Sequence, residues 1–404
     1  MKLAGKRIIA GILVFLACFC TIAGAMAESH AVNTEENGRI TETIWQNEQG
    51  DTVSGPDGYA IVRYTYKRDS TTEKYFDPEG EPCMAAGGYY QKTVTKDGKG
   101  NIVQIEYMDA NGERMLNALG YGMVTISYYG FGDERMITYY GLGKRPVIVP
   151  SLGYASVVNL YSSKTLTNRI YRDEKGNPVD NADGYAEIKK KLNKRYQVLV
   201  TRYDHADGSP ATGPDGWFRC LTDRDDKGRV TSIKYYDTEN RLMDRGNGYA
   251  WEGYAYEGEN IVKVTRYSLD DLAVEDEAGI VTVVREMKDG KIVRESFLDK
   301  DGKRVNNKNG VGGIRYAYDL QGALEKVSYE DTEGNAVKCE AGYAGYRDTK
   351  DEDGATVSRT FLGTDGLAIE IPGGYSEIRY FYDDTKQLTA TRYYDINGKQ
   401  VAAE

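Results

Sequence analysis

The sequence has few of the residues on which catalytic sites usually depend. Its 404 residues include two histidines, His30 and His205. It also has no Gly-x-Ser-x-Gly elbow, no phosphate-binding loop and no His-x-x-x-His pair. Carboxylates are plentiful, and glycosidases need only two of them. Here, however, the carboxylates recur at turn positions, where a structural role explains them. We therefore predict a protein that is not an enzyme and that uses no cofactor.

An excess of positive charge is also missing. The chain has 62 acidic and 52 basic residues, which gives a formal net charge of −10. Residues 1–27 contain three basic and no acidic side chains, so the remainder carries −13. Affinity for nucleic acids depends largely on Lys and Arg side chains that neutralise phosphates. The composition therefore predicts no nucleic-acid partner.

Cysteine is too sparse for a disulfide scaffold. Beyond residue 27 the chain contains Cys83, Cys220 and Cys339, which are 137 and 119 residues apart. A disulfide requires Cα atoms about 5.5 Å apart, and residues so distant in an elongated array of repeats cannot approach that closely. We expect three free, mostly buried thiols. A closed, compact fold would weaken this expectation.

Long apolar runs are missing except at the start of the chain. A basic segment with Lys2, Lys6 and Arg7 precedes the apolar run 8–23, and 25–27 is a small-x-small cleavage site. This is the layout of a secretory signal peptide. We therefore predict a signal peptide over 1–27 and a secreted or cell-surface mature chain.

Two other interpretations of the N-terminus fit less well. A transmembrane anchor would need a stop-transfer cluster, but Glu28, Ser29 and His30 follow a short run. A lipoprotein would be modified at Cys18, yet Phe15 stands three residues before it and the chain stays apolar beyond it. No second run is long enough to cross a bilayer, so the mature chain is predicted to have no membrane span.

A Gly-Tyr pair recurs at a nearly constant spacing along the rest of the chain. Steps of 30 to 33 residues separate the successive glycines, and Trp217, Ile280 and Val311 replace the tyrosine in three copies. A fixed period of 20–50 residues marks a repeat architecture. The glycines are Gly58, Gly88, Gly120, Gly153, Gly184, Gly216, Gly248, Gly279, Gly310, Gly342 and Gly374.

Each repeat reads as a β-hairpin followed by a short return. In residues 88–120, a first strand from Gly88 to Val94 and a second strand over 102–107 flank a Gly/Asp/Asn turn. Apolar and aromatic residues alternate with polar ones along the first strand, as at Ile314, Tyr316 and Tyr318. This alternation is typical of a half-buried antiparallel strand.

The repeats predict an all-β fold. We expect tandem antiparallel β-hairpins of about 32 residues that form an elongated, solenoid-like or superhelical sheet, stabilised by contacts between neighbouring repeats. A closed propeller is the alternative, although 32 residues is short for a four-stranded blade. The predicted domains are a divergent half-repeat that forms an N-terminal cap over 28–57 and an eleven-copy repeat domain over 58–404.

A second regular mark is an Asp-x-x-Gly motif after the second strand. It occurs at Asp77, Asp109, Asp173, Asp299, Asp331 and Asp395. Asp at the first position and Gly at the fourth suit a type I turn in which the carboxylate accepts hydrogen bonds from turn amides. The segments 299–302 and 351–354 resemble fragments of a calcium loop but lack its remaining ligands. We interpret them as turns and predict no metal site.

The aromatic residues are the candidate ligand contacts. We interpret the ring of each Gly-Tyr pair as packing between repeats. In the pairs Tyr235-Tyr236 and Tyr393-Tyr394, adjacent residues point to opposite faces of the sheet, so one ring lies outside the local core. That ring either packs on another repeat or binds a ligand. With Trp217 and Trp251, these four tyrosines are the predicted ligand-binding residues.

These motifs carry a family resemblance. The segment Tyr393-Tyr394-Asp395-Ile396-Asn397-Gly398 and the recurring Gly-Tyr pair resemble the Tyr-rich β-hairpin repeats of bacterial secreted and surface proteins, such as the RHS/YD and WG types. They also look like cell-wall and glucan-binding repeats, which pair aromatics, a turn and Gly-Trp. Those repeats, however, have a period near 20 and are rich in Trp, whereas this chain has Trp only at 45, 217 and 251.

The resemblance implies a function for the exported chain. It points to a non-enzymatic surface protein that binds cell-wall or extracellular polysaccharide through repeated aromatic sites. The alternative is a structural spacer or a protein-binding adhesin with no affinity for carbohydrate. A continuous row of exposed rings would favour binding, whereas buried rings would favour a scaffold.

Overall fold

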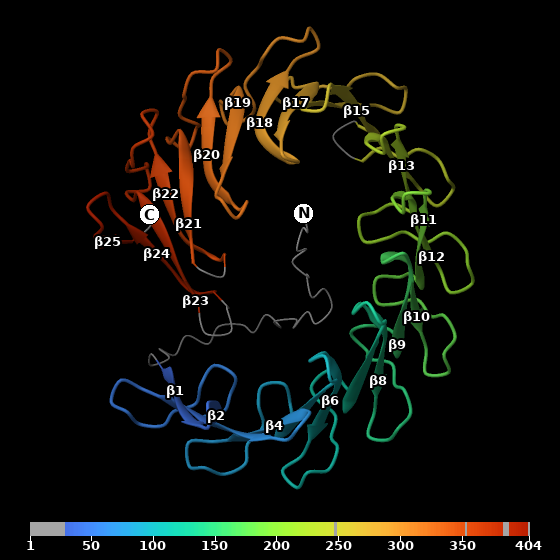
Figure 1. The fold of residues 1–404 in the computed structure, drawn as a ribbon, viewed down its shortest axis with the longest axis vertical. Coiled ribbons are helices and arrows are strands. Elements are labelled where there is room, and N and C mark those ends of the chain that lie inside the picture. Colours follow the sequence, from blue (N-terminus) through green and yellow to red (C-terminus); the bar gives the residue numbers. More distant parts are fainter. Residues whose placement is uncertain (1–28, 246–248, 352–353, 383–387, 403–404) are drawn as a thin grey trace. The chain divides into compact units, whose positions relative to one another are not determined.

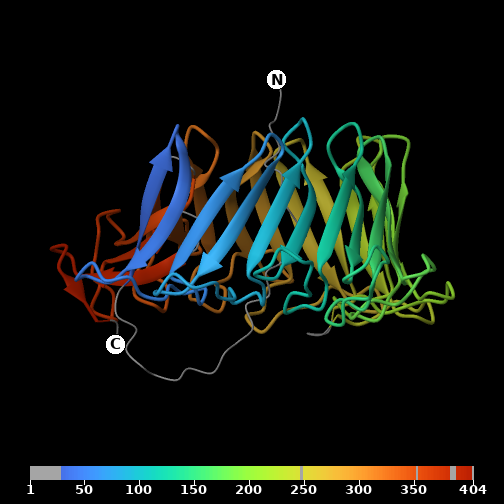
Figure 2. The same ribbon diagram turned by 90° about the horizontal axis from the view of Figure 1, so that it is seen from below.

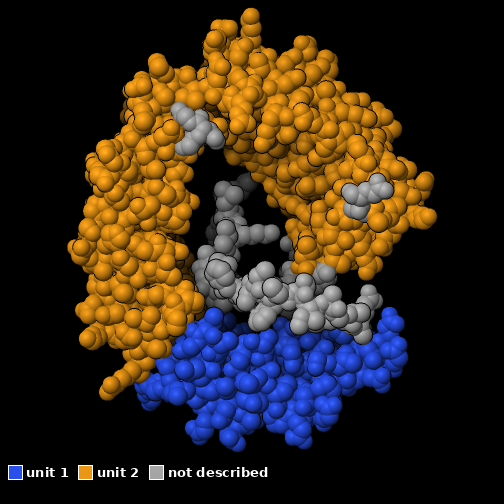
Figure 3. Space-filling view, turned by 180° about the vertical axis from the view of Figure 1, so that it is seen from behind, with its two compact units in different colours: residues 1–125, 140–144 blue, residues 126–139, 145–404 orange. Residues whose placement is uncertain are grey.

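The computed structural model describes residues 29–245, 249–351, 354–382 and 388–402. Every regular element in these ranges is a β-strand. The chain divides into two compact units, coloured separately in Figure 3. Unit 1 comprises the chain up to residue 125 together with 140–144, and unit 2 comprises 126–139 and 145–404. The predicted signal peptide lies outside the described residues.

Unit 1 is a run of antiparallel strands in chain order (Figure 1). Each strand pairs with the next, and the first residues of β7 pair with β6. The predicted cap over 28–57 contains the first hairpin, in which β1 is exposed along its whole length. The strands are β1 (His30–Glu36), β2 (Arg39–Gln46), β3 (Ile61–Tyr66), β4 (Ser70–Phe76), β5 (Gln91–Lys96), β6 (Ile102–Met108) and β7 (Met123–Tyr128), of which the last belongs to unit 1 only up to Thr125.

Unit 2 continues the same pattern. From β8 onward each strand pairs antiparallel with its successor, and the ladder is not divided into separate four-stranded blades. The strands are β8 (Glu134–Tyr140), β9 (Ser156–Ser162), β10 (Thr165–Arg172), β11 (Glu187–Leu192), β12 (Val198–Asp204), β13 (Arg219–Arg224), β14 (Val230–Tyr236), β15 (Trp251–Glu257), β16 (Ile261–Tyr267), β17 (Thr282–Lys288), β18 (Lys291–Leu298), β19 (Gly313–Tyr318), β20 (Leu324–Glu330), β21 (Gly345–Lys350), β22 (Thr356–Leu362), β23 (Glu377–Tyr382), β24 (Leu388–Tyr394) and β25 (Gln400–Val401).

The tandem β-hairpin fold predicted from the repeats is therefore confirmed. Within a hairpin the pairing is long, with six residue pairs joining β19 to β20. Between hairpins it is shorter, with three pairs joining β18 to β19. The predicted alternation holds, since Ile314 lies opposite Tyr329 and Tyr316 lies opposite Val327. These apolar side chains therefore share one face of the sheet.

The first strand of each repeat starts later than the sequence indicates. In the repeat that begins at Gly88 it starts at Gln91. Gly88 has a φ of +78°, in the left-handed region that favours glycine. The next residue, Tyr89, makes an isolated bridge to Ala85. The Gly-Tyr pair thus closes the connection that precedes the strand and does not open the strand itself.

The long connections contain the predicted Asp turns. In the connection after β6, the Asp109 carboxylate accepts hydrogen bonds from the amides of Asn111 and Glu113, both at 2.9 Å. The return segment then makes single bridges to the strand that it leaves, such as Met108 with Arg114. Figure 2 shows these connections gathered at one end of the strands in each unit. The predicted short return after each hairpin is therefore confirmed.

Aromatic rings form the core of this connection end. Rings of Gly-Tyr pairs alternate with rings from the second strands, and successive ring centroids are 4.6 to 6.1 Å apart. We call this row the ring ladder. In unit 1 it contains Tyr59, Tyr75, Tyr89, Tyr107 and Tyr121. In unit 2 it contains Tyr139, Tyr154, Tyr171, Tyr185, Tyr203, Trp217 and Tyr235, and then Tyr329, Tyr343, Phe361, Tyr375 and Tyr393.

All the ring pairs named in the ladder are tilted or edge-to-face, and the edge-to-face arrangement is one that aromatic quadrupoles favour. Between the two runs of unit 2, the aliphatic side chains Ile280 and Val311 pack with Phe297 instead. The interpretation of the Gly-Tyr ring as packing between repeats agrees with this arrangement, because rings such as Tyr89 and Tyr185 contact rings of both flanking second strands.

Candidate ligand site

The candidate site begins with a pair of small side chains on the ladder face of the sheet. Where β12 meets β13, Thr201 lies opposite Cys220. The same position between other hairpins holds larger pairs, such as Ile105 with Val124 in unit 1 and Ile137 with Val157 in unit 2. The smaller pair fills less of the face. A hollow therefore opens beside the ring ladder.

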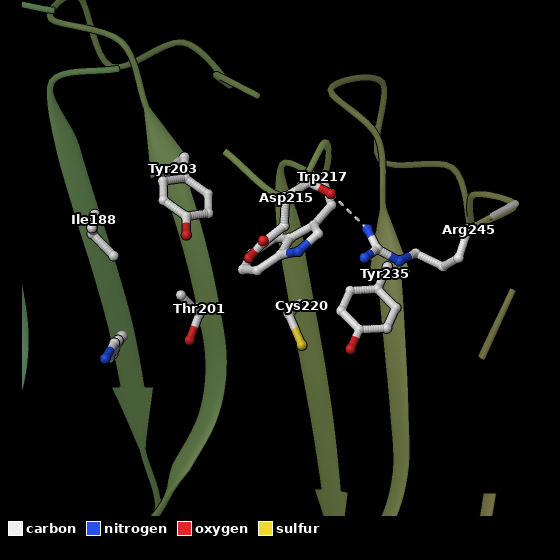
Figure 4. Close-up of a pocket in the computed structure, with 9 residues that line it drawn as sticks. Ile188, Thr201, Tyr203, Asp215, Trp217, Cys220, Tyr235 and Arg245 are labelled. Atoms are coloured by element: carbon white, nitrogen blue, oxygen red, sulfur yellow. Dashed lines mark hydrogen bonds between the residues drawn. The ribbon is translucent and has the colours of Figure 1, made fainter. Parts of the chain in front are cut away.

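This hollow is a cavity of about 470 Å³. That volume lies in the range of roughly 300–1,000 Å³ typical of small-molecule sites. Strands β11 to β14 and the segments that follow β12 and β14 contribute its walls (Figure 4). Its lining residues are Ile188, Lys190, Thr201, Tyr203, Asp215, Trp217, Cys220, Tyr235 and Arg245.

Three rings of the ladder line the cavity. The Trp217 indole lies 4.9 Å from Tyr203 and 5.9 Å from Tyr235, measured between ring centroids. Tyr203 and Trp217 are each 7% exposed, whereas Tyr235 is half-buried. Two of the rings are thus held rigidly by packing. Tyr235 presents more of its surface to solvent and to any ligand in the cavity.

Two cationic side chains also line the cavity. The Lys190 ammonium makes no hydrogen bond or ion pair with the described residues. Burial, and secondarily the charge of Arg169, lower the pKa of Lys190 below its usual range. The Arg245 guanidinium lies over the Tyr235 ring at 4.4 Å and donates a 2.8 Å hydrogen bond to the Asp215 carbonyl. Its Nε is buried without a hydrogen-bond partner in the described structure.

Cys220 contributes a thiol to the cavity. Burial raises its pKa, and this effect outweighs the opposing contributions of Thr222 and Arg245. The thiolate that would act as a nucleophile is therefore disfavoured at neutral pH. Cys83, Cys220 and Cys339 are all free, as expected, but each is half-buried and not mostly buried. Cys220 lies in β13, whereas Cys83 and Cys339 lie in return segments, and neighbouring side chains cover all three only partly.

The structure brings two of the six predicted ligand-binding residues, Trp217 and Tyr235, into this cavity. Tyr236 points to the opposite face, where the Arg219 guanidinium covers its ring at 4.1 Å. The pair Tyr235-Tyr236 is thus split between the two faces. The sequence alone did not locate the cavity, because the equivalent pairs between other hairpins vary widely, from Ile105 with Val124 to Glu73 with Lys92.

The other three predicted residues make separate contacts. Trp251 stacks on Tyr267 at 4.0 Å, and its indole N–H donates a 2.9 Å hydrogen bond to Asp271. Tyr393 ends the ring ladder, with its centroid 4.8 Å from that of Tyr375. Tyr394 is covered by the Arg379 guanidinium at 4.0 Å. Each of these three rings is half-buried and already packed against a neighbour.

The carboxylates considered as calcium ligands lie in turns. Asp299 accepts hydrogen bonds from the amides of Asp301 and Lys303 at 2.9 and 2.8 Å, and Asp351 accepts one from Ala355 at 2.8 Å. Residues 352 and 353 lie outside the described part of the chain. Within that part no group of three or more His, Cys, Asp or Glu side chains could hold a metal ion.

A second cavity, of about 380 Å³, lies at the short-turn end of β14 to β18. Its walls are largely apolar, with Val230, Ile233, Tyr254 and Tyr256 among them. The Tyr256 hydroxyl donates a 2.9 Å hydrogen bond to the Val230 carbonyl and so ties neighbouring hairpins together.

The described residues contain no helix with the length and apolar character needed to cross a bilayer.

Comparison with known proteins identifies no family. No family model matches the sequence, and no curated protein matches it. Among solved structures, 90% of the chain aligns with the TcdB2-TccC3-Cdc42 complex at 12% identity and a TM-score of 0.31. It covers 20% of that chain. The Tc holotoxin pore of Photorhabdus luminescens aligns over 90% of this chain and 21% of its own, at 13% identity and a TM-score of 0.29.

A porin-like protein from Bacteroides uniformis aligns over 82% of this chain and 91% of its own, at 7% identity and a TM-score of 0.22. The chain thus spans about a fifth of the length of the toxin chains that it matches. At these TM-scores the likenesses carry no functional information. The β-hairpin repeat fold rests on the strand pairing described above.

Proposed function

We propose that the chain is an exported, non-enzymatic repeat protein that binds an extracellular or cell-wall polysaccharide at the cavity beside Thr201 and Cys220. One observation supports this most directly. The rings of Tyr203, Trp217 and Tyr235, a threonine hydroxyl and charged side chains converge on one hollow. Sugars present apolar C–H faces to aromatic rings and hydroxyls to polar groups, and this wall offers both.

The proposal differs from a repeated aromatic site. Most rings of the ladder are packed against one another, and Tyr75, Tyr107, Tyr171 and Tyr185 are at most 9% exposed. Such rings have little surface left for a ligand. Tyr203 and Trp217, each 7% exposed, are as buried as these rings, so the half-buried Tyr235 is the ring that offers surface to a ligand. Binding is therefore concentrated at the hollow, where small side chains leave room beside Tyr235.

The burial of the ladder also favours a second candidate, a structural spacer with no affinity for carbohydrate. In that case every ring serves to hold neighbouring hairpins together, and the cavity is a gap in side-chain packing with no ligand of its own. The two candidates differ in what filling the cavity would do. Filling the cavity would abolish polysaccharide binding in a binding protein, whereas a spacer has no such function to lose.

The test is retention of the purified mature chain on a panel of immobilised polysaccharides. A double variant, Thr201→Ile with Cys220→Val, copies the Ile105–Val124 pair and fills the hollow. We expect the wild type to be retained on at least one polysaccharide and the double variant to be lost from it. The double variant should keep its thermal stability, because it restores a pair that the fold already uses.

A matched control separates the cavity from the ladder. Tyr393→Ala removes a ladder ring from the same position of another repeat, away from the cavity. It should leave retention unchanged. If the wild type is retained on no polysaccharide, or if the filled variant is retained equally well, the binding function is refuted and the spacer is favoured.

A further inference from the structure

The charges of the cavity define the chemical class of the ligand more narrowly. We infer that the cavity binds an anionic polysaccharide segment, whose carboxylate or phosphate groups meet Lys190 and Arg245. This inference rests on the proposed function and deepens it. It concerns the charge of the ligand, which the aromatic walls do not determine.

Lys190 is the first element of the argument. Its ammonium is half-buried on the ladder face, and no acidic side chain of the described structure lies within ion-pairing distance. A desolvated cation without a counter-charge is costly, as its lowered pKa indicates. An anionic ligand in the cavity would offset that cost.

Lys189, the preceding residue of the same strand, is a cation that has ion-pair partners. Lys189 points to the opposite face and forms ion pairs with Glu187 at 3.0 Å and with Asp204 at 2.9 Å. These partners raise the pKa of Lys189, although desolvation opposes them. The fold thus supplies ion-pair partners to Lys189 on one face of β11 and none, among the described residues, to Lys190 on the cavity face.

Arg245 supplies the second cation, at the far side of the cavity. Its guanidinium is held by the Asp215 carbonyl and the Tyr235 ring, so its direction is fixed. Figure 4 shows this guanidinium beside Trp217 and above Tyr235. Asp215 is the acidic residue in the lining, and it is exposed. Two cations and one exposed carboxylate leave the wall net positive in a chain whose formal charge is −10.

The spacing of the two cations indicates a polymer segment. Lys190 lies on β11 and the ring under Arg245 belongs to β14, three strands away in the sheet. With neighbouring strands about 4.8 Å apart, that distance is about 14 Å. A ligand that meets both groups must therefore cross the strands between them. An extended chain lying across the strands places successive acidic groups against both, with a sugar ring against the half-buried Tyr235.

The experiment compares charge variants on defined probes. Lys190→Met removes the cavity cation, and Lys191→Met is its matched control. Lys191 is exposed in the same strand, one residue further on, and so on the opposite face. Lys190→Arg restores the charge. The probes are polygalacturonate, its methyl ester as the neutral form, and poly(glycerol phosphate), each immobilised for equilibrium binding.

We expect the wild type to bind one acidic probe at least tenfold more tightly than methyl-esterified polygalacturonate. Lys190→Met should weaken that binding about 10- to 100-fold, as the loss of a charged hydrogen bond does. Lys191→Met should leave it unchanged, and Lys190→Arg should restore most of it. Preference for polygalacturonate or for poly(glycerol phosphate) identifies the anionic group as a carboxylate or a phosphate.

The possible failures are distinguishable. Equal binding of the acidic and neutral probes, or equal losses in Lys190→Met and Lys191→Met, overturns the inference and leaves polysaccharide binding standing. Retention on neutral polysaccharides alone has the same meaning. If the wild type binds no polysaccharide of either charge, both the inference and the proposed function are wrong.

Discussion

Replacing two glycines of the Gly-Tyr repeat with alanine separates two reasons for their recurrence. Gly153 and Gly184 belong to neighbouring repeats of unit 2 and have φ angles of +79° and +86°. A Cβ on Gly184 would have no atom within 4 Å. A Cβ on Gly153 would lie 2.7 Å from the Ala182 amide nitrogen and 2.9 Å from the Asn181 carbonyl carbon. The two sites therefore share a backbone conformation and differ in available space.

The geometry gives the expected magnitudes. Alanine in the left-handed region costs about 1–2 kcal/mol, so Gly184→Ala should lower the free energy of unfolding by that amount. Gly153→Ala carries the same cost and must also push back the backbone of the next repeat. Overpacking of this kind costs about 1–3 kcal/mol, so the total is about 2–5 kcal/mol. The contact includes the 2.8 Å hydrogen bond from the Ala182 amide to the Leu152 carbonyl, which the added methyl would disturb.

Native-state hydrogen exchange measured by mass spectrometry is the appropriate assay, because opening free energies in repeat proteins are local. Peptides covering 150–190 should exchange faster in both variants, and more so in Gly153→Ala. Peptides from β21 to β24 serve as the internal control. Equal effects of the two substitutions would show that close approach contributes nothing. An unchanged Gly184→Ala would show that the positive φ is not what requires glycine.

Three other predictions concern the ring ladder and the turns. Tyr171 is 7% exposed and contacts Tyr154 and Tyr185, so Tyr171→Ala should destabilise the protein by about 3–5 kcal/mol; urea unfolding would check this, with the milder Tyr171→Phe as control. Tyr196 occupies a turn at φ +60° and is 49% exposed, so Tyr196→Gly should raise the unfolding midpoint by relieving about 1 kcal/mol of strain, and an unchanged or lower midpoint would contradict this reasoning. Burial raises the pKa of Tyr154 to about 12. Its contribution to stability is present below pH 10 and is lost as the pH rises from 10 to 12, a loss of about 3 kcal/mol. This loss should shrink in Tyr154→Phe when unfolding is followed against pH.

The fold could be predicted from the sequence because the repeats share the same alternation of apolar and polar residues and the same kinds of turn. The alternation at Ile314, Tyr316 and Tyr318 indicates which face is buried, and an Asp turn follows many of the second strands, as at Asp109. The start of the first strand could not be placed, because the left-handed conformation of Gly88 is a property of the finished connection. The half-burial of the cysteines also depends on neighbours from adjacent repeats.

The candidate site could be predicted only in part. Trp217 and Tyr235 were singled out as aromatic residues, but their convergence depends on the pairing of Thr201 with Cys220 across two hairpins. That pairing requires the register between hairpins, which the sequence of a single repeat does not specify. Lys190 looks like an ordinary strand lysine next to Lys189 and Lys191 until the structure shows which faces carry acidic partners.

The even number of strands in each repeat has a consequence for how such a gene can change. A repeat adds one hairpin and, in most copies, two rings, one from the Gly-Tyr pair and one from the second strand. Duplication or deletion of one whole repeat therefore leaves the direction of every later strand unchanged. The side chains of those strands also stay on the same faces of the sheet. Loss of a single strand would reverse both. Recombination between copies can thus alter the length of the protein in steps of about 32 residues without disturbing the remainder.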